Sequence, residues 1–140
     1  MEKEFRKLPD SELKVMQIIW DMHKENKSVD SGAMMRCYPD IIGHLKLTTV
    51  LTLTTRLNEK GFIKTEKRGR VNYYTPVVNE EQYKNNAAAE FVETVYKSSP
   101  INLMSALFEI GALKKEDIDE FRRQISDKTE KTEKNDDAGK

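Results

Sequence analysis

Hydrophobic residues in the first part of the chain recur at helical spacing in three segments. The first begins near Asp10 and carries apolar side chains on more than one side, which predicts a buried central helix. A short second helix is predicted over 31–37, behind Asp30, whose carboxylate is a favourable N-cap. The third runs over about 48–60 and ends at Gly61, a typical residue after a helix C-terminus.

The pattern then changes to two short segments typical of β-strands, 62–67 and 71–75. Between them lies Arg68-Gly69-Arg70, in which the glycine readily adopts the positive φ of a tight turn. Three helices followed by a hairpin with a basic tip is the element order of a winged helix-turn-helix.

Helical spacing returns in the rest of the chain. Asn79 is expected to cap a long helix, which Ser98-Ser99-Pro100 interrupts, and two further helices are predicted over about 101–110 and 114–125. From about residue 127 charged and polar residues follow one another with almost no apolar ones, which is typical of disorder.

The predicted fold is therefore mainly α with a small β-hairpin wing, a winged helix-turn-helix followed by a C-terminal helical module. The predicted parts are a winged-helix DNA-binding domain at 1–78, a helical dimerisation domain at 79–126 and a disordered tail at 127–140.

The net charge of the chain is zero, but its charges are unevenly distributed. Residues 1–78 carry 14 Lys and Arg against 10 Asp and Glu, whereas residues 79–140 carry 10 against 14. Residues 46–75 alone carry 7 basic and 2 acidic side chains. A local excess of positive charge indicates an anion-binding surface, and nucleic acid is a common partner of such surfaces. Charge alone leaves an ordinary solvated surface as the alternative.

The third predicted helix has the features of a DNA-reading helix. Its apolar positions on one side are Leu47, Val50, Leu53 and Leu57. The opposite side is rich in threonine, a poor helix former whose use on an exposed face needs a reason. A threonine hydroxyl can contact a phosphate or a base edge, and its methyl group can pack against a thymine methyl. A merely solvated face is the alternative. The candidate DNA-binding residues here are Lys46, Thr48, Thr49, Thr52, Thr55 and Arg56.

The hairpin tip supplies the second set of candidate DNA contacts. Two arginines beside a glycine can follow a phosphate backbone or enter an adjacent minor groove. A charged hairpin can also serve only to prevent edge-to-edge association of sheets. The candidate residues of the tip are Lys67, Arg68 and Arg70.

The C-terminal helices each carry one apolar stripe on an otherwise polar surface. Such stripes cannot form a deep core from about 47 residues, so they are expected to pair with a second chain. A two-fold dimer would present two recognition helices to two operator half-sites. The alternative is that these helices fold back on residues 1–78 as one monomeric domain. The candidate dimerisation residues are Phe91, Val95, Ile101, Met104, Leu107, Phe108, Ile118, Phe121 and Ile125.

The sequence offers little material for catalysis or metal binding. It has one cysteine, Cys37, and two histidines, His23 and His44, and it lacks His-x-x-x-His, Cys-x-x-Cys and glycine-rich phosphate-loop motifs. Cys37 and His44 would need further ligands or an orienting acid to form a site. We therefore expect no enzyme activity, no cofactor and no metal.

Membrane insertion is not expected either. The apolar runs are far shorter than the roughly 20 residues that span a bilayer, and the first residues lack the apolar core of a signal peptide. These features predict a cytoplasmic protein.

Four stretches of the sequence carry the motifs of one known family. They are Leu8-Pro9-Asp10-Ser11-Glu12-Leu13 with Ile19-Trp20, Thr49-Val50-Leu51-Thr52-Leu53 with Arg56-Leu57, Arg68-Gly69-Arg70 with Tyr73-Tyr74-Thr75-Pro76, and the segment 113–121. In this order they resemble the opening helix, recognition helix, wing and closing acidic helix of the penicillinase-repressor family (the BlaI/MecI/CopY type) of bacterial winged-helix transcriptional regulators. The resemblance extends over about residues 8–125.

This resemblance implies a dimeric repressor of β-lactam-resistance, copper-homeostasis or related genes. In the penicillinase branch a membrane sensor protease signals the antibiotic, and the repressor is cut at an Asn-Phe pair in its dimerisation domain. That pair would fall on Ala106-Leu107 here, so the residues do not match. In the copper branch C-terminal Cys-x-Cys motifs bind metal, but cysteine is absent after Cys37.

We therefore predict a transcriptional repressor that binds a two-fold symmetric operator as a homodimer and controls antibiotic-resistance or cell-envelope-stress genes. Its expected partners are operator DNA, a second copy of the chain and, by the resemblance, a membrane sensor protease. The alternatives are a small-molecule-sensing winged-helix repressor and a winged-helix protein-interaction module that does not bind DNA.

Overall fold

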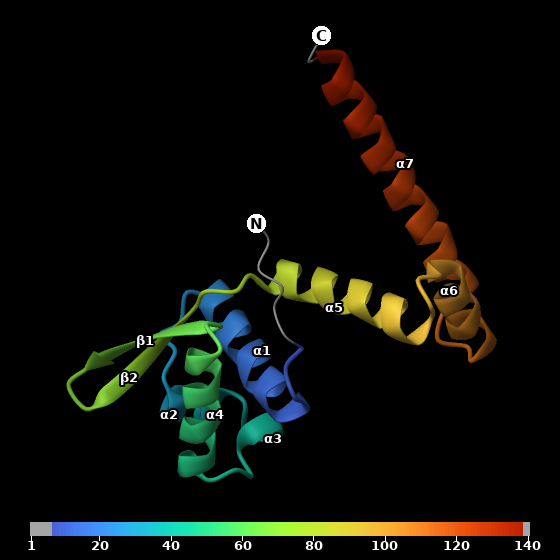
Figure 1. The fold of residues 1–140 in the computed structure, drawn as a ribbon. Helices are drawn as coiled ribbons and strands as arrows, with labels where there is room; N and C mark the ends of the chain where they lie inside the picture. The colour runs from blue at the N-terminus through green and yellow to red at the C-terminus, as the bar shows by residue number, and fades with distance from the viewer. Residues whose placement is uncertain (1–6, 139–140) are drawn as a thin grey trace. The chain divides into compact units, whose positions relative to one another are not determined.

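A computed structural model of the chain describes residues 7–138, with side-chain burial described as far as residue 132. The chain divides into two compact units, Met1–Ala88 and Ala89–Lys140, which are described separately below. The elements are α1 (Asp10–Lys24), α2 (Ser31–Cys37), α3 (Pro39–Ile42), α4 (Leu47–Glu59), β1 (Ile63–Arg68), β2 (Val71–Pro76), α5 (Glu80–Val95), α6 (Pro100–Glu109) and α7 (Lys115–Ala138) (Figure 1). The fold is mainly helical with one antiparallel hairpin, which confirms the predicted fold class.

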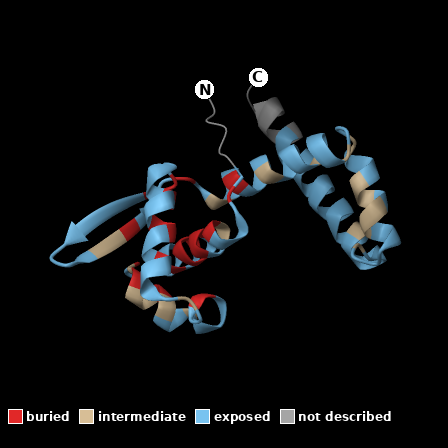
Figure 2. Ribbon diagram, turned by 60° about the horizontal axis from the view of Figure 1, so that its bottom comes forward, coloured by how far each residue is buried: buried red, intermediate tan, exposed pale blue. Residues whose placement is uncertain are grey.

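Helix α1 is the centre of the first unit. Most of its apolar residues are fully buried, including Val15, Met16 and Ile19, and it packs against α4 and β2. Figure 2 shows that the buried residues concentrate in these elements. A helix that is apolar on more than one side is stable only when neighbours cover those sides, and here α4 and the hairpin provide that cover.

The segment between α1 and α4 contains one helix, α3, that the sequence did not predict. The carboxylate of Asp30 caps α2 by accepting a hydrogen bond from the backbone N–H of Ala33 at 2.9 Å, as expected. Helix α3 then begins at Pro39, where the sequence pattern indicated only the end of α2. Proline at the first position of a helix needs no N–H donor and already has a helical φ, so it ends α2 and starts α3.

Strand β2 of the hairpin is hydrogen-bonded to the segment before α2. Strands β1 and β2 pair from Ile63 opposite Pro76 to Arg68 opposite Val71, within one residue of the predicted limits. The N–H of Tyr74 donates to the carbonyl of Val29 at 2.8 Å, which joins β2 to the segment before α2. The hairpin is therefore a fixed part of the first unit and not a free loop.

The first turns of α5 belong to the first unit. The side chain of Asn79 accepts from the N–H of Glu81 at 2.8 Å, which confirms the predicted cap. The buried Tyr83 lies near Trp20, and its hydroxyl accepts from the N–H of Leu8 at 2.9 Å. Because these contacts hold α5 to the core, the division between the units falls after Ala88, whereas the sequence suggested residue 78.

The second unit is entirely helical. Lys97 and Ser98 have positive φ values and end α5, and the hydroxyl of Ser99 caps α6 by accepting from the N–H of Asn102. Helix α7 continues to Ala138, whereas the sequence suggested disorder from residue 127; residues 139–140 of that segment lie outside the described residues. Opposite charges four residues apart, such as Asp127 and Lys131, favour this longer helix.

Candidate nucleic-acid interface

Helix α4 separates its residues cleanly between the core and the surface. Val50, Leu53 and Leu57 are buried against the rest of the first unit. The six residues in and just before this helix that were predicted to contact DNA are all exposed: Lys46, Thr48, Thr49, Thr52, Thr55 and Arg56. The structure therefore brings them together on one accessible side, as a DNA-reading helix requires.

One residue of α4 differs from its expected place, and a residue for which the sequence pattern made no prediction joins the buried side. Leu47, predicted to belong to the apolar row, is 49% exposed, and Thr54 takes a place on the buried side. The hydroxyl of Thr54 is satisfied there, because it lies 2.8 Å from the carbonyl of Leu51 and 3.2 Å from the hydroxyl of Tyr74. Tyr74 in turn lies 3.0 Å from the hydroxyl of Ser31. These hydroxyl contacts join α2, α4 and β2 and fix the orientation of the reading helix.

Two of the exposed threonines, Thr52 and Thr55, donate their hydroxyl protons to backbone carbonyls of α4. Thr52 donates to the carbonyl of Thr48 at 2.9 Å, and Thr55 donates to that of Leu51 at 2.8 Å. Each hydroxyl oxygen keeps a lone pair for accepting, and each side chain still presents a methyl group. In this conformation the two threonines therefore offer acceptors and apolar contacts to a base edge.

The hairpin tip presents its three predicted basic residues to solvent. Lys67, Arg68 and Arg70 are all exposed around Gly69, which has a φ of +65°. The guanidinium of Arg68 lies 5.0 Å from the ring centre of Tyr73 and also donates to Glu66 at 3.2 Å. An exposed ion pair of this kind contributes little to stability, so Arg68 is free to exchange Glu66 for a phosphate.

A polar groove of about 310 Å³ separates α4 from the hairpin. At one point the two walls are joined directly, because Thr65 of β1 donates to the side-chain oxygen of Asn58 at 2.9 Å. No sequence pattern indicates this contact, because it depends on the register of the hairpin. The residues that line the groove are Leu51, Thr54, Thr55, Asn58, Thr65, Asn72 and Tyr74.

A partly buried ion pair holds the C-terminal end of α4 against α1. The ammonium of Lys60 lies 2.6 Å from a carboxylate oxygen of Glu12, whose side chain is only 4% exposed. In the sequence Glu12 had no visible role beyond the first turn of its helix. The pair is formed by residues 48 positions apart, so only the fold reveals it.

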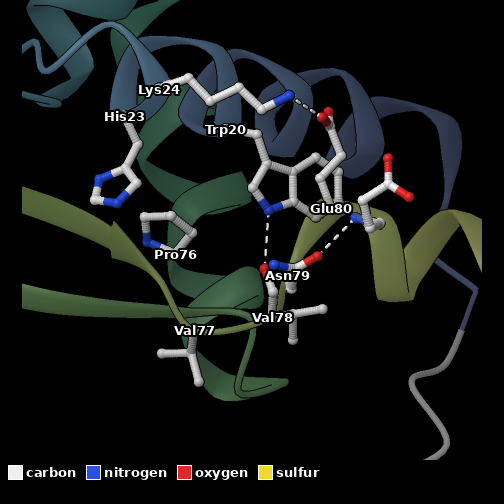
Figure 3. Close-up of a pocket in the computed structure, with 9 residues that line it drawn as sticks. Trp20, His23, Lys24, Pro76, Val77, Val78, Asn79 and Glu80 are labelled. Carbon is white, nitrogen blue, oxygen red and sulfur yellow. Dashed lines mark hydrogen bonds and ion pairs between the residues drawn. The ribbon is translucent and has the colours of Figure 1, made fainter. Parts of the chain in front are cut away.

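A second cavity, of about 290 Å³, lies where α1 meets the connection from β2 to α5 (Figure 3). Several of its polar side chains are paired: the indole N–H of Trp20 donates to the carbonyl of Val78 at 2.9 Å, and Lys24 pairs with Glu80. The hydrogen bond to Glu80 raises the pKa of Lys24 above its ordinary value. These contacts attach the start of α5 to α1.

Metal-ligand clusters and membrane-spanning helices are both absent from the part of the chain that the structure describes. No three His, Cys, Asp or Glu side chains among these residues lie close enough to share a metal ion. None of the helices within residues 7–138 is both long enough and apolar enough to cross a membrane.

The sequence model of the penicillinase repressor family matches residues 8–127 of this chain. The chain belongs to the penicillinase repressor family. This confirms the resemblance found in the sequence motifs and makes the chain a DNA-binding winged-helix repressor of the BlaI/MecI type and not an enzyme.

Individual members of the penicillinase repressor family match over most of their length. The methicillin resistance regulatory protein MecI of Mammaliicoccus sciuri is 29% identical over 131 residues, which cover 91% of this chain and 100% of that protein. The penicillinase repressor of Bacillus licheniformis is 27% identical over 125 residues, covering 85% of this chain and 89% of that one. A solution structure of the DNA-binding domain of the repressor BlaI is 30% identical and covers 59% of this chain and 94% of that one, with a TM-score of 0.46.

The residues that we predicted for dimerisation lie largely on the surface of this chain. Six of the nine are exposed, and the other three, Met104, Leu107 and Ile118, are only partly covered. Ile101 is 67% exposed and Phe108 57%. Apolar exposure of this extent is unfavourable in water unless another surface covers it.

Proposed function

We propose that this protein represses transcription as a homodimer bound to a two-fold symmetric operator. The observation that carries the proposal is the pairing of α4, with its exposed threonines, and the basic hairpin tip in one rigid unit. Tyr74 and the Asn58–Thr65 hydrogen bond hold these two elements together. A fixed helix and wing can contact one half-site at once without a large loss of entropy on binding.

The two elements take different parts in binding. Helix α4 enters the major groove with its first turns, so Thr48, Thr49 and Thr52 meet base edges and determine sequence preference. Arg68 and Arg70 contact phosphates beside that groove and add affinity that depends on salt and not on sequence. Occupation of the operator by two such units excludes the transcription machinery.

Exposed apolar side chains in the second unit support the dimer. Phe108 and Phe121 are about half exposed, and these helices carry too few covered residues to form a core of their own. Pairing with the same surface of a second chain would cover them and generate two-fold symmetry. The dimer then binds two half-sites with the avidity that a single winged helix lacks.

The regulated genes and the releasing signal form the finer part of the proposal. Relatives named for methicillin resistance and penicillinase repression suggest antibiotic-resistance or cell-envelope-stress genes. Release by a membrane sensor protease would act on the second unit, and the intact mass of the repressor before and after antibiotic exposure tests this. An unchanged mass during induction would contradict it.

Iterative selection from a randomised duplex library, followed by a salt titration on the selected sequence, tests the main proposal. We expect a palindromic consensus, a steep fall of affinity with salt, and two chains per duplex by light scattering. A selection without enrichment at any salt concentration would contradict operator binding. A non-palindromic consensus bound by one chain would contradict the dimer.

A further inference from the structure

Two leucines stand among the threonines on the exposed part of α4. Leu51 is 37% exposed and Leu47 is 49% exposed, and both belong to the first two turns of the helix. Residues four apart lie on the same side of a helix, one turn above the other, so the two side chains form a continuous apolar strip. We call Leu47 and Leu51 the leucine strip.

The neighbours of the leucine strip add apolar surface rather than free donors. Thr55, one turn beyond Leu51, and Thr52 beside it donate their hydroxyl protons to backbone carbonyls of α4. Their methyl groups remain on the surface. Leu51 also lines the groove between α4 and the hairpin, so the strip lies on the side of α4 that faces the wing.

The surroundings of the leucine strip indicate a polyanionic partner. Lys46 immediately precedes it, Arg56 lies on the same helix, and Lys67, Arg68 and Arg70 form the nearby tip, all of them exposed. An apolar strip on a unit that carries several exposed cations suits a partner that is negatively charged outside and apolar within. The major groove of DNA has this arrangement wherever thymine occurs, because thymine presents a C5 methyl group there.

We propose that the leucine strip recognises thymine methyl groups in each half-site of the operator. The inference rests on the proposed function and adds the base that these residues select. The first turns of a recognition helix are the ones that reach base edges, and both leucines lie there. Transfer of one methyl group from water to an apolar contact corresponds to about a fourfold gain in affinity.

The test replaces single thymines of the selected operator with deoxyuridine, which lacks only the methyl group. The full-length wild type, Leu51→Ala and Leu47→Ala are each measured on the thymine and deoxyuridine duplexes. Both leucines are exposed, so their truncation leaves the core intact, and thermal melting checks this. Leu51→Met keeps an apolar side chain of similar size and serves as the rescue variant. Val77→Ala removes an exposed apolar side chain outside α4 and serves as the matched control.

For the wild type we expect about a fourfold loss of affinity when one thymine is replaced in one half-site, and about a sixteenfold loss when the same thymine is replaced in both half-sites. The alanine variant of the leucine that contacts this thymine changes both chains of the dimer. It should therefore bind the thymine duplex about as weakly as the wild type binds the duplex with deoxyuridine in both half-sites. It should show no further loss on that deoxyuridine duplex. Leu51→Met should recover the sensitivity to the methyl group that Leu51→Ala loses, and Val77→Ala should behave as the wild type.

Two results would overturn the inference while leaving the proposed function intact. One is a selected operator that binds with the expected salt dependence but tolerates deoxyuridine at every position. The other is an equal deoxyuridine penalty in the wild type and in both alanine variants, which would assign the methyl contact to other residues. If no operator is enriched at all, the proposed function fails and the inference fails with it.

Discussion

The two units of this repressor solve the problem of apolar burial in opposite ways. In the first unit α1, α4 and the hairpin bury a shared core, and residues such as Met16 and Leu57 are fully covered. In the second unit no residue between 89 and 132 is buried, although α6 is rich in large apolar side chains (Figure 2). The comparison indicates that the first unit is stable by itself, whereas the second requires another surface.

This difference agrees with the division of work that we propose. A DNA-reading unit must hold its side chains in a fixed geometry before it meets the operator, because ordering them during binding costs affinity. A dimerisation unit can leave its apolar residues uncovered in one chain, since the second chain completes the core. Stability of the first unit should therefore be independent of protein concentration, and that of the second should depend on it.

The largest effect is expected from Leu57→Ala, which breaks the core of the first unit. Leu57 is fully buried in α4, so truncation should lower the free energy of unfolding by about 2–5 kcal/mol. Urea unfolding followed by circular dichroism measures the loss, which should be the same at low and high protein concentration. Leu51→Ala on the exposed side of the same helix is the control, and an equal loss in both variants would contradict the assigned core.

A somewhat smaller effect is expected from Phe108→Glu combined with Phe121→Glu in the second unit. Charges on these exposed positions should prevent dimerisation and lower operator affinity by about a hundredfold or more, because avidity is lost. Light scattering reports the mass, and binding to a single half-site should stay unchanged. A double variant that remains dimeric would mean that other residues form the interface.

An intermediate effect should follow removal of the ion pair between α1 and α4. Lys60→Met leaves the Glu12 carboxylate buried without its cation, which costs about 1–3 kcal/mol after allowance for the partly exposed lysine. Chemical unfolding measures this, with Lys64→Met on the exposed face of β1 as the control. If both lysine variants are equally stable, the pair contributes nothing to the position of α4.

Sequence reasoning found the elements of the first unit other than α3, because each of them has a local signal. Asp30 and Asn79 are caps, Gly69 permits a turn, and hydrophobic spacing marks α1 and α4. The contacts that fix the site lack such signals. The hydroxyl group of Tyr74 meets Thr54 only after β2 has been placed against α4, so periodicity cannot reveal that contact.

The dependence on neighbouring elements also explains the exposure of Leu47 and the burial of Thr54 on α4. Leu47 fits the helical spacing of the apolar row, but it is the first residue of the helix, and no neighbouring element covers it. Thr54 fits the spacing of the buried side, and the hydroxyl of Tyr74 supplies the partner that its own hydroxyl group needs there. Hydrophobic patterns therefore predict which side of α4 faces the core, but they do not predict the ends of that side.

The smallest effect is expected at the hairpin tip, where it sharpens the contrast between charge and core. On a duplex that holds one half-site, Arg68→Ala and Arg70→Ala should each reduce the salt slope of DNA binding by about 1 and weaken binding about fivefold near physiological salt, similarly for the half-site and for an unrelated duplex of the same length. Folding stability should not change, because both arginines are exposed. Filter binding over a range of salt concentrations measures both effects.

Arg122→Ala with Lys128→Ala provides the matched control for the tip, because it removes two exposed basic residues from the second unit. The control should keep the wild-type salt slope if the positive charges that meet phosphate belong to the first unit alone. An equal change of slope in the control would show that binding responds to total charge and not to the tip. A change confined to Arg68 and Arg70 would instead tie the electrostatic contribution to the hairpin, since only contacts that release counterions from the duplex alter the slope.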